Sequence, residues 1–340
     1  MVEAIIDRYF NVISYTDSSY IGYFRGDAEE LSRKMQDELA RMDVYAAIDR
    51  VVDAYRVTLL HIPPQKKKIW VHFLLVFLTF ITTLYAGALH AGVDPFKNPV
   101  DLLKGLPFSL SLMLILGLHE MGHYLASKRY GIKATLPYFL PVPHPLIGTM
   151  GAFIKVKSPI THKDALMEIG SMGPIVGFFV ALPVSIIGIS LSKIVPVSST
   201  AGHLKLGTPL VFNILTHIVH GTVGKGYDIM LHPVAFAGWI GMFVTSLNLL
   251  PVGQLDGGHV SFALFGEFHR VISRIVFMVL LVLGFFWPGW WFWNFMLLLL
   301  GLYHPPILNH VAPLSSKGKF LGFLSIFIFF ITFIPIPFSV

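Results

Sequence analysis

The chain has 340 residues, of which 54% are apolar and only 13% are charged, whereas soluble domains average roughly 45–50% and about 25%. This composition excludes an ordinary soluble globular protein and predicts an integral membrane protein in a lipid bilayer. The net charge of +6 does not indicate a nucleic-acid partner, because the basic residues form no tract interleaved with aromatic residues. The absence of cysteine excludes disulfides, iron–sulfur centres and cysteine-ligated zinc, so a bound metal would need His, Asp or Glu ligands.

The charged residues are concentrated at the start of the chain. Up to Lys68 there are 10 Lys/Arg and 11 Asp/Glu, which leaves 15 and 8 of the totals of 25 and 19 for the rest. We therefore expect a small cytosolic α/β head over residues 1–65 and a membrane body over residues 66–340. The first 25 residues hold no basic segment followed by an apolar one, so we expect no cleaved signal peptide and a cytosolic N-terminus.

Within the head, three strands and one helix are predicted. Asp27, with Glu30 three residues on, has the pattern of a capping box, and apolar residues at helical spacing follow. The strand-like runs are residues 20–25, 44–52 and 55–62. Together these elements give a β-α-β-β unit. Because its core is small, we expect the head to pack against the membrane body or a partner. A linker over residues 63–68 follows.

The body is predicted to be an all-α polytopic membrane protein with about 6–7 transmembrane helices. Its apolar stretches, at about 1.5 Å of helix per residue, are mostly long enough to cross the hydrocarbon, although the sixth is short. The stretches are residues 70–91, 107–127, 165–191, 232–250, 271–287, 290–303 and 320–338. With the head in the cytosol, the cytosolic segments after residue 65 hold 13 Lys/Arg and the outer segments hold five, which supports this multi-pass orientation by the positive-inside rule.

Two histidines and a carboxylate lie inside the second predicted span. His119 and His123 are four residues apart, so both imidazoles lie on one helical face and can bind a single zinc ion, with Glu120 beside them. Ionisable groups at membrane depth are costly, which favours a functional site over the alternative, a polar helix-packing patch. Lys128 follows His119 by nine residues, or about 13 Å of helix, so we expect the site in the cytosolic half of the bilayer.

A catalytic zinc site normally takes three protein ligands and one water, so a third ligand is needed. The fourth predicted span ends near Asn248 on the cytosolic side, and Asp256 follows after a stretch containing Pro251 and Gly253. Proline removes a backbone donor and glycine permits tight turns, so the helix can break here and direct a side chain inward. Asp256 is therefore available on the required side of the membrane.

These motifs resemble those of the site-2 protease family of intramembrane zinc metalloproteases. The resemblance covers about residues 70–259 and rests on His119-Glu120-x-x-His123, Gly170-Ser171-Met172-Gly173-Pro174 and Asn248-x-x-Pro251-x-Gly253-x-Leu255-Asp256-Gly257. It implies one zinc ion per chain, held by His119, His123 and Asp256, with Glu120 activating the water. We therefore expect residues 66–340 to form a transmembrane metalloprotease domain with a catalytic core at about 70–260, while the head and the additional C-terminal spans at about 271–340 lie outside the resemblance.

The expected activity is that of an intramembrane zinc endopeptidase, which cuts membrane-tethered substrates within or next to their transmembrane helices in regulated intramembrane proteolysis. Zinc lowers the pKa of its water to about 7, and Glu120 would carry the proton to the leaving amine. Asn248 is a candidate donor to the oxyanion or substrate backbone, or else satisfies backbone groups where the helix breaks. The expected partners are single-span transmembrane proteins and the lipid bilayer, and the oligomeric state stays open.

A membrane-associated β hairpin is expected between the second and third spans, where four prolines precede an extended run over residues 148–157. It resembles the hairpin of the same family. Because a helical substrate hides its scissile carbonyls, a free strand edge could hold an unwound stretch by main-chain hydrogen bonds. The candidate substrate-binding residues are Gly148, Thr149, Met150, Gly151, Ala152 and Phe153. The alternative is a structural hairpin that covers the site.

Two other functions could use the same residues, namely a catalytically silent relative that binds membrane helices and a divalent-metal carrier. Glu120 argues against the first, because a binding protein needs no general base, and the outer half of the spans offers no chain of polar ligands for the second. His259, three residues after Asp256, could support the metal site from a second layer. The pattern around His304 and His310 favours capping or interfacial roles. The head could select substrate, inhibit, or gate entry.

Overall fold

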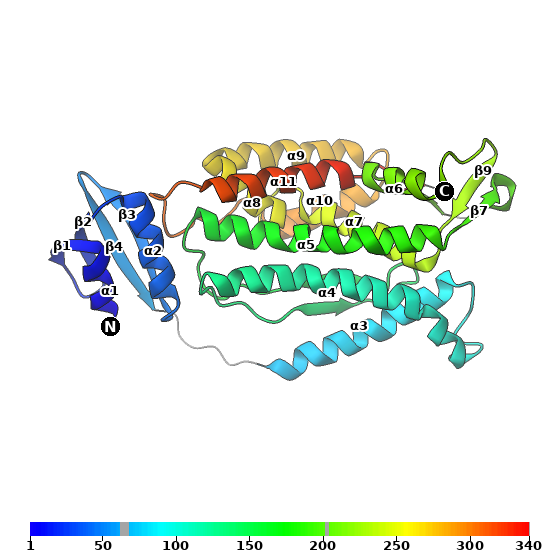
Figure 1. Cartoon of the computed structure of the whole chain (residues 1–340), viewed down its shortest axis with the longest axis horizontal. Coiled ribbons are helices and arrows are strands. Elements are labelled where there is room, and N and C mark those ends of the chain that lie inside the picture. Colours follow the sequence, from blue (N-terminus) through cyan, green and yellow to red (C-terminus); the bar gives the residue numbers. More distant parts are fainter. Residues whose placement is uncertain (62–67, 201–203, 340) are drawn as a thin grey trace.

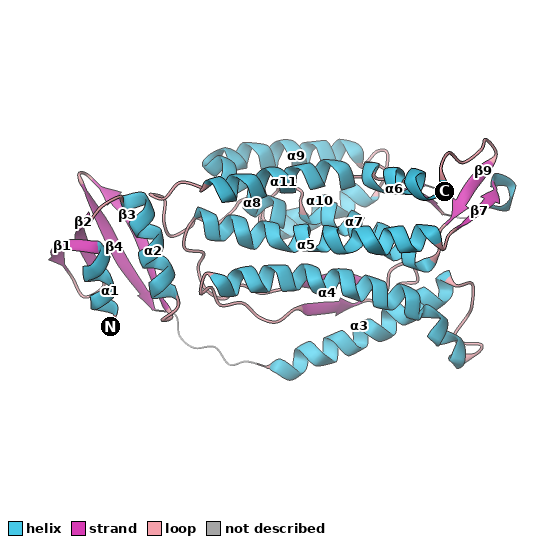
Figure 2. Cartoon of the chain, in the orientation of Figure 1, coloured by secondary structure: helices cyan, strands magenta, loops and turns pink. Residues whose placement is uncertain are grey.

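The structure is a computed structural model that describes residues 1–61, 68–200 and 204–339. A small α/β head lies at one end of a long helical body (Figure 1). Strands are confined to the head and to short pairs in the body (Figure 2). Most of the predicted linker, residues 63–67, lies outside the described residues.

The head is a four-stranded antiparallel sheet packed with two helices, which is one strand and one helix more than the sequence predicted. Its elements are α1 (Val2–Tyr9), β1 (Phe10–Tyr15), β2 (Ser19–Phe24), α2 (Ala28–Ala40), β3 (Val44–Val51) and β4 (Ala54–His61). The strand order is β1-β2-β4-β3. The first two elements were missed because the chain passes from α1 directly into β1, with no glycine or proline to mark the boundary.

The predicted capping of α2 is found in part. Asp27 accepts a hydrogen bond from the backbone N–H of Glu29 at 2.9 Å, which satisfies a donor that the first helical turn leaves unpaired. Glu30 instead pairs with Lys34 at 2.6 Å. Among the described residues, therefore, the helix start is as predicted and only the Asp27 half of the capping box is seen.

The small core of the head is completed by the body, as expected. Met35 and Leu39 of α2 pack against Ile48 of β3, all three fully buried, and Val311 from the body packs on the same cluster. The backbone N–H of Ile48, on the edge strand β3, donates to the carbonyl of Leu308 at 2.8 Å. The head thus rests on the segment that connects the last two helices of the body.

Three helical segments of the described chain are long and apolar enough to cross a membrane, namely α3, η1 with α4, and α5. The helices of the body are α3 (Ile69–His90), η1 (Pro99–Gly105), α4 (Leu106–Arg129), α5 (Lys163–Ser190), η2 (Val197–Thr200), α6 (Leu210–His220), α7 (Pro233–Asn248), α8 (Asp256–Phe265), η3 (Gly266–Phe268), α9 (His269–Leu283), α10 (Gly289–Leu300) and α11 (Ser316–Thr332). The strands are β5 (Tyr138–Pro141), β6 (Thr149–Phe153), β7 (Lys193–Pro196), β8 (Lys205–Leu206), β9 (Tyr227–Met230) and β10 (Phe338–Ser339).

The other predicted spans correspond to shorter helices. The stretch 232–250 is α7, which has 16 residues, and the chain then runs without regular helix to Leu255 before α8 begins at Asp256. The short sixth stretch is α10, with 12 residues. The helix therefore breaks after Asn248, where the proline and glycines of the sequence indicated that it would.

Helix α5 packs against α4 (Figure 1) and against α7, and α4 and α7 also contact each other. Small residues permit this close approach. A Cβ on Gly122 of α4 would lie 2.5 Å from the carbonyl oxygen of Met172, and a Cβ on Gly188 of α5 would overlap the backbone of Ala235 on α7. Because an added methyl would push these helices apart, the glycines hold α4, α5 and α7 at short distance around the candidate site.

The expected hairpin between the second and third predicted spans is present. Strands β5 and β6 pair antiparallel, with Tyr138 opposite Phe153 and Phe139 opposite Ala152. Among the described residues, β6 pairs with β5 alone, so its other edge has no strand partner.

Candidate metal centre

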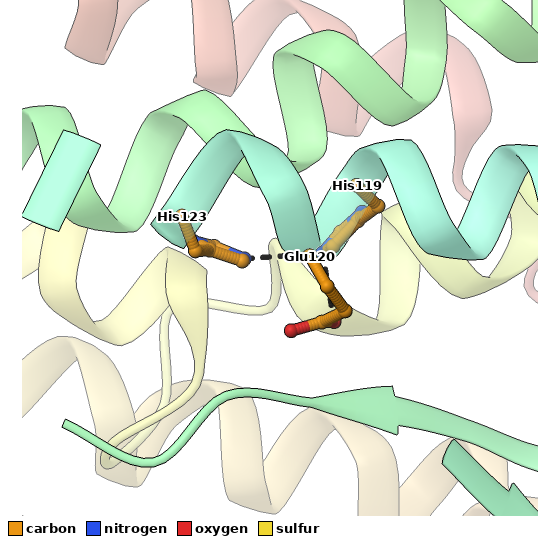
Figure 3. Close-up of side chains that lie close together, drawn as sticks. All are labelled: His119, Glu120 and His123. Carbon is orange, nitrogen blue, oxygen red and sulfur yellow. Dashed lines mark hydrogen bonds and ion pairs between the residues drawn. The ribbon is translucent and has the colours of Figure 1, made fainter. Parts of the chain in front are cut away.

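Helix α4 brings two imidazoles and a carboxylate together inside the body. His119, Glu120 and His123 are buried, with 3%, 5% and 5% exposed. The Nε2 atoms of His119 and His123 lie 3.2 Å apart, and Glu120 Oε1 lies 3.9 Å from Nε2 of His119. Figure 3 shows the two rings turned toward each other, with the Glu120 side chain beside them. The four-residue spacing produces this arrangement because residues i and i+4 lie one turn apart on the same helical face.

Asp256 reaches the same point from a separate helix. Its Oδ2 lies 3.4 Å from Nε2 of His119 and 3.2 Å from Nε2 of His123. Asp256 is the first residue of α8, and the broken backbone before it aims its side chain back toward α4. Gly253 adopts a φ of +55° in this break, a conformation that glycine takes without steric cost.

The hydrogen-bond partners of the two imidazole rings show that each ring directs the lone pair of its Nε2 atom toward the centre of the site. The Nδ1–H of His123 donates to the carbonyl of Ile169 at 2.6 Å, so a neutral His123 carries its lone pair on Nε2. The amide nitrogen of Asn248, 3.2 Å from Nε2 of His119, can only donate, so this Nε2 also carries its lone pair, and a bound metal would take that lone pair in place of the Asn248 hydrogen bond. Two imidazole lone pairs and a carboxylate oxygen therefore converge, and a cation between them would relieve their mutual repulsion.

The distances between the three candidate ligand atoms can be compared with those expected around a bound zinc ion. Three ligand atoms at about 2.0–2.2 Å from a tetrahedral zinc ion lie about 3.3–3.6 Å from one another. The three observed separations of 3.2 to 3.4 Å lie near or just below the lower end of this range. His119, His123 and Asp256 could therefore hold the metal, and Glu120 lies close enough to the two histidines to belong to the same metal-binding group.

Glycines of α5 make the space for the two imidazoles, a feature that the sequence reasoning missed. A Cβ on Gly173 would overlap the His123 ring at Nε2, and a Cβ on Gly177 would lie 2.8 Å from Nδ1 of His119. The signal was present as the spacing Gly173-x-x-x-Gly177, which puts two glycines on one helical face. No sequence pattern predicts that the backbone carbonyl of Ile169 orients the His123 ring.

The candidate substrate-binding residues lie on and next to β6. Gly148, with φ of +78°, approaches α3 at Thr82 and Thr83, which anchors the turn of the hairpin. Met150 and Phe153 are 61% and 45% exposed. Thr149 instead faces inward, donating to the carbonyl of Leu140 at 2.8 Å.

The other strand positions bring the hairpin toward the centre. A Cβ on Gly151 would meet no atom within 4 Å, and Ala152 pairs with Phe139 of β5. The backbone of Ile154, directly after β6, lies beside the Glu120 carboxylate. The end of the free strand edge therefore lies next to the candidate metal centre.

Comparison with known proteins places the chain in a family. Residues 107–287, slightly more than half of the chain, match the family model described as Peptidase family M50. The probable zinc metalloprotease EGY2, chloroplastic, of Arabidopsis thaliana is 28% identical over 273 residues, which cover 78% of this chain and 47% of that protein. The probable zinc metalloprotease EGY1, chloroplastic, of the same plant is 29% identical over 242 residues, covering 68% and 43%.

The match to a third relative is shorter. The probable zinc metalloprotease EGY2, chloroplastic, of Oryza sativa subsp. japonica is 30% identical over 200 residues, covering 56% of this chain and 35% of that protein. The chain therefore spans less than half the length of these relatives. No solved structure gives a significant match. The expected resemblance to the site-2 protease family is confirmed, and the chain belongs to peptidase family M50.

Proposed function

We propose that this chain is an intramembrane zinc endopeptidase that hydrolyses peptide bonds within or next to the transmembrane helices of single-span substrates. The observation that carries this proposal is the meeting of Asp256 Oδ2 with the Nε2 atoms of His119 and His123, from two motifs more than 130 residues apart, within 3.4 Å. Such convergence of three metal-ligand atoms beside a buried carboxylate suits metal-assisted hydrolysis. Family membership and the zinc metalloprotease names of the relatives support the same reaction.

The residues of the site divide the work of peptide hydrolysis. When bound, zinc supplies Lewis acidity that polarises the scissile carbonyl and makes a water nucleophilic near pH 7. His119, His123 and Asp256 hold the ion. Glu120 accepts the proton of the attacking water on its carboxylate and delivers it to the nitrogen of the leaving amine. Asn248, whose amide already points into the site at His119, donates to the developing oxyanion or to the substrate backbone.

We propose that the body is multi-pass, with about 6–7 transmembrane helices, a cytosolic N-terminus and an active site in the cytosolic half of the bilayer. The excess of Lys and Arg in the segments on the side of the head supports this orientation. The three long apolar helices and the shorter apolar helices packed with them supply the spans. Asn248 ends α7 partway through the body, and the irregular backbone that follows is tolerated at depth because protein surrounds it.

We further propose that residues 148–153 hold the substrate as an added strand. The free edge of β6, the exposure of Met150 and Phe153, and the position of Ile154 beside Glu120 support this role. Strand addition uses main-chain hydrogen bonds and so makes small demands on substrate sequence. A substrate that unwinds easily near its cut site would then react faster than one that stays helical.

The test uses the full-length protein in liposomes with synthetic single-span peptides, one with an uninterrupted apolar helix and one with an Asn-Gly pair in the cytosolic half of the span. With zinc, we expect cleavage near the Asn-Gly pair and much slower cleavage of the uninterrupted helix, as measured by mass spectrometry of the products. Elemental mass spectrometry should find about one zinc per chain. His119→Ala and Asp256→Ala should each lose both the zinc and the cleavage, because two ligands hold a catalytic zinc poorly.

The other outcomes identify the competing functions. Zinc content that is indifferent to Asp256→Ala would contradict the shared site. Binding of the peptides without cleavage by the zinc-loaded protein would point to a catalytically silent helix-binding protein. Movement of zinc across the liposome membrane in the absence of hydrolysis would point to a metal carrier.

A further inference from the structure

The segment from Gly301 to Ser315, which connects α10 to α11, touches both the head and the helix that begins with Asp256. It has no regular secondary structure over most of its length, yet His304, Ile307 and Asn309 within it are buried. Buried irregular chain is costly unless its polar groups are paired. The partners of this segment therefore show what it holds together.

On one side, the segment is bonded to the head. Asn309 donates from Nδ2 to Ser32 Oγ at 3.1 Å and to Gln36 Oε1 at 2.9 Å, and all three residues have no exposed surface. Gln36 in turn donates to the carbonyl of Ala46 at 2.7 Å. Leu308 accepts the backbone N–H of Ile48, which adds a short parallel bridge to the edge of the head sheet. Since unpaired buried amides are expensive, these bonds fix the segment in one position.

On the other side, the segment is bonded to α8 through two histidines. Nδ1 of His304 lies 2.6 Å from the carbonyl oxygen of Pro305, which can only accept, so Nδ1 carries the proton. Burial and the neighbouring His259 lower the pKa of His304 to about 3, so the ring is neutral at pH 7 and its Nε2 is an acceptor. Nε2 therefore accepts from the Nδ1–H of His259, 2.6 Å away. The ring of His304 also stacks on Phe262 of α8, with centroids 4.5 Å apart.

His259 and Asp256 lie on the first turn of the same short helix. They are three residues apart, so they share one face of α8. His259 also packs against α5, because a Cβ on Gly170 would lie 2.6 Å from the His259 Cβ. The break before α8 touches the segment directly too, since a Cβ on Gly253 would overlap the carbonyl of Gly301. A shift of His259 would thus rotate the turn that carries the Asp256 carboxylate.

We propose that His259 and His304 are positioning residues that fix Asp256 at the metal centre, and that the head secures them by holding Asn309. This assignment rests on the proposed function, because it takes Asp256 to be a metal ligand. It gives the head a structural connection to the active site through residues 301–315. His304 accordingly has a role other than the capping or interfacial one that the sequence favoured.

The test uses the full-length protein in detergent, loaded with zinc, and measures the rate at which zinc passes to a chromogenic chelator. His304→Phe keeps the stacking on Phe262 but removes the Nε2 acceptor. We expect it to release zinc about 10–100-fold faster than wild type, the usual effect of losing a partner that orients a ligand. His310→Ala is the matched control, because His310 is an exposed histidine in the same segment, and it should release zinc at the wild-type rate.

Two further measurements separate positioning from general damage. His259→Asn keeps a donor near the position of Nδ1 and should retain most of the wild-type behaviour, whereas His259→Leu should behave as His304→Phe. Cobalt in place of zinc reports the ligand geometry, so its visible absorption bands should shift in His304→Phe and His259→Leu and stay in place in His310→Ala. Thermal unfolding without added metal shows whether each variant is folded.

The role of the head is tested with the variant Gln36→Leu. The control is Asn11→Ala, which changes an exposed residue of β1. We expect Gln36→Leu to accelerate zinc release in the same direction as His304→Phe and by a smaller factor. Release at the wild-type rate in this variant would overturn the role of the head. Wild-type release and cobalt spectrum in both His304→Phe and His259→Leu would overturn the positioning role while the proposed function stands. A wild-type protein that binds no zinc would overturn both.

Discussion

Gly173→Ala is expected to abolish metal binding and peptide hydrolysis while leaving the protein folded. The added Cβ would occupy the place of the His123 ring, overlapping its Nε2, Cδ2 and Cε1 atoms. The ring cannot swing aside cheaply, because its Nδ1–H is bonded to Ile169 and the site is closely packed. Alanine is a better helix former than glycine by up to about 1 kcal/mol, so helix α5 itself gains from the change. The loss should therefore appear in the site and not in the fold.

The measurement is zinc per chain together with the cleavage of the Asn-Gly peptide. We expect zinc content to fall below about one tenth of the wild-type value under chelating wash, since displacing one of three ligands removes the tetrahedral set. Gly117→Ala on α4 is the matched control, because its Cβ would lie an ordinary 3.7 Å from Phe139. Gly177→Ala, at 2.8 Å from the His119 ring, should have an intermediate effect. Full zinc content in Gly173→Ala would contradict the geometry of the centre.

The parts of the site that local spacing determines could be predicted from the sequence. His119 and His123 share a helical face in any α-helix, and the proline and glycines clustered after Asn248 favour a break in the helix there. Asp256 needed a further step, because its approach to α4 depends on the order and direction of the spans. That the three ligand atoms lie within 3.4 Å of one another is known only from the structure.

The parts that depend on packing between distant elements could not be predicted. The sequence does not say which face of α5 meets α4, so Gly177 was missed and Gly173 was noted as part of a motif without its steric role. The pairing of His259 with His304 joins residues 45 positions apart across two elements. The first helix and strand of the head were missed for a different reason, since the boundary between them carries no turn residue.

Glu120→Gln should lose hydrolysis and keep the metal. The amide has nearly the shape of the carboxylate but cannot take a proton from water, and the loss of a general base costs about 10²–10⁴-fold in rate. The nearest Glu120 oxygen is 3.9 Å from Nε2 of His119, while Asp256 Oδ2 comes within 3.4 Å of both rings. The three ligands therefore remain when Glu120 is changed, and about one zinc per chain is expected.

The comparison is made with Glu267→Gln, which changes an exposed carboxylate paired with Arg270 and should cleave the peptide at the wild-type rate. Rates are followed by mass spectrometry at saturating zinc, so that weakened binding cannot imitate lost chemistry. A Glu120→Gln variant that cleaves as fast as wild type would remove the general base from the mechanism. A variant that loses its zinc along with its activity would instead indicate that Glu120 is a metal ligand. The roles assigned to the residues of the two motifs would then have to change.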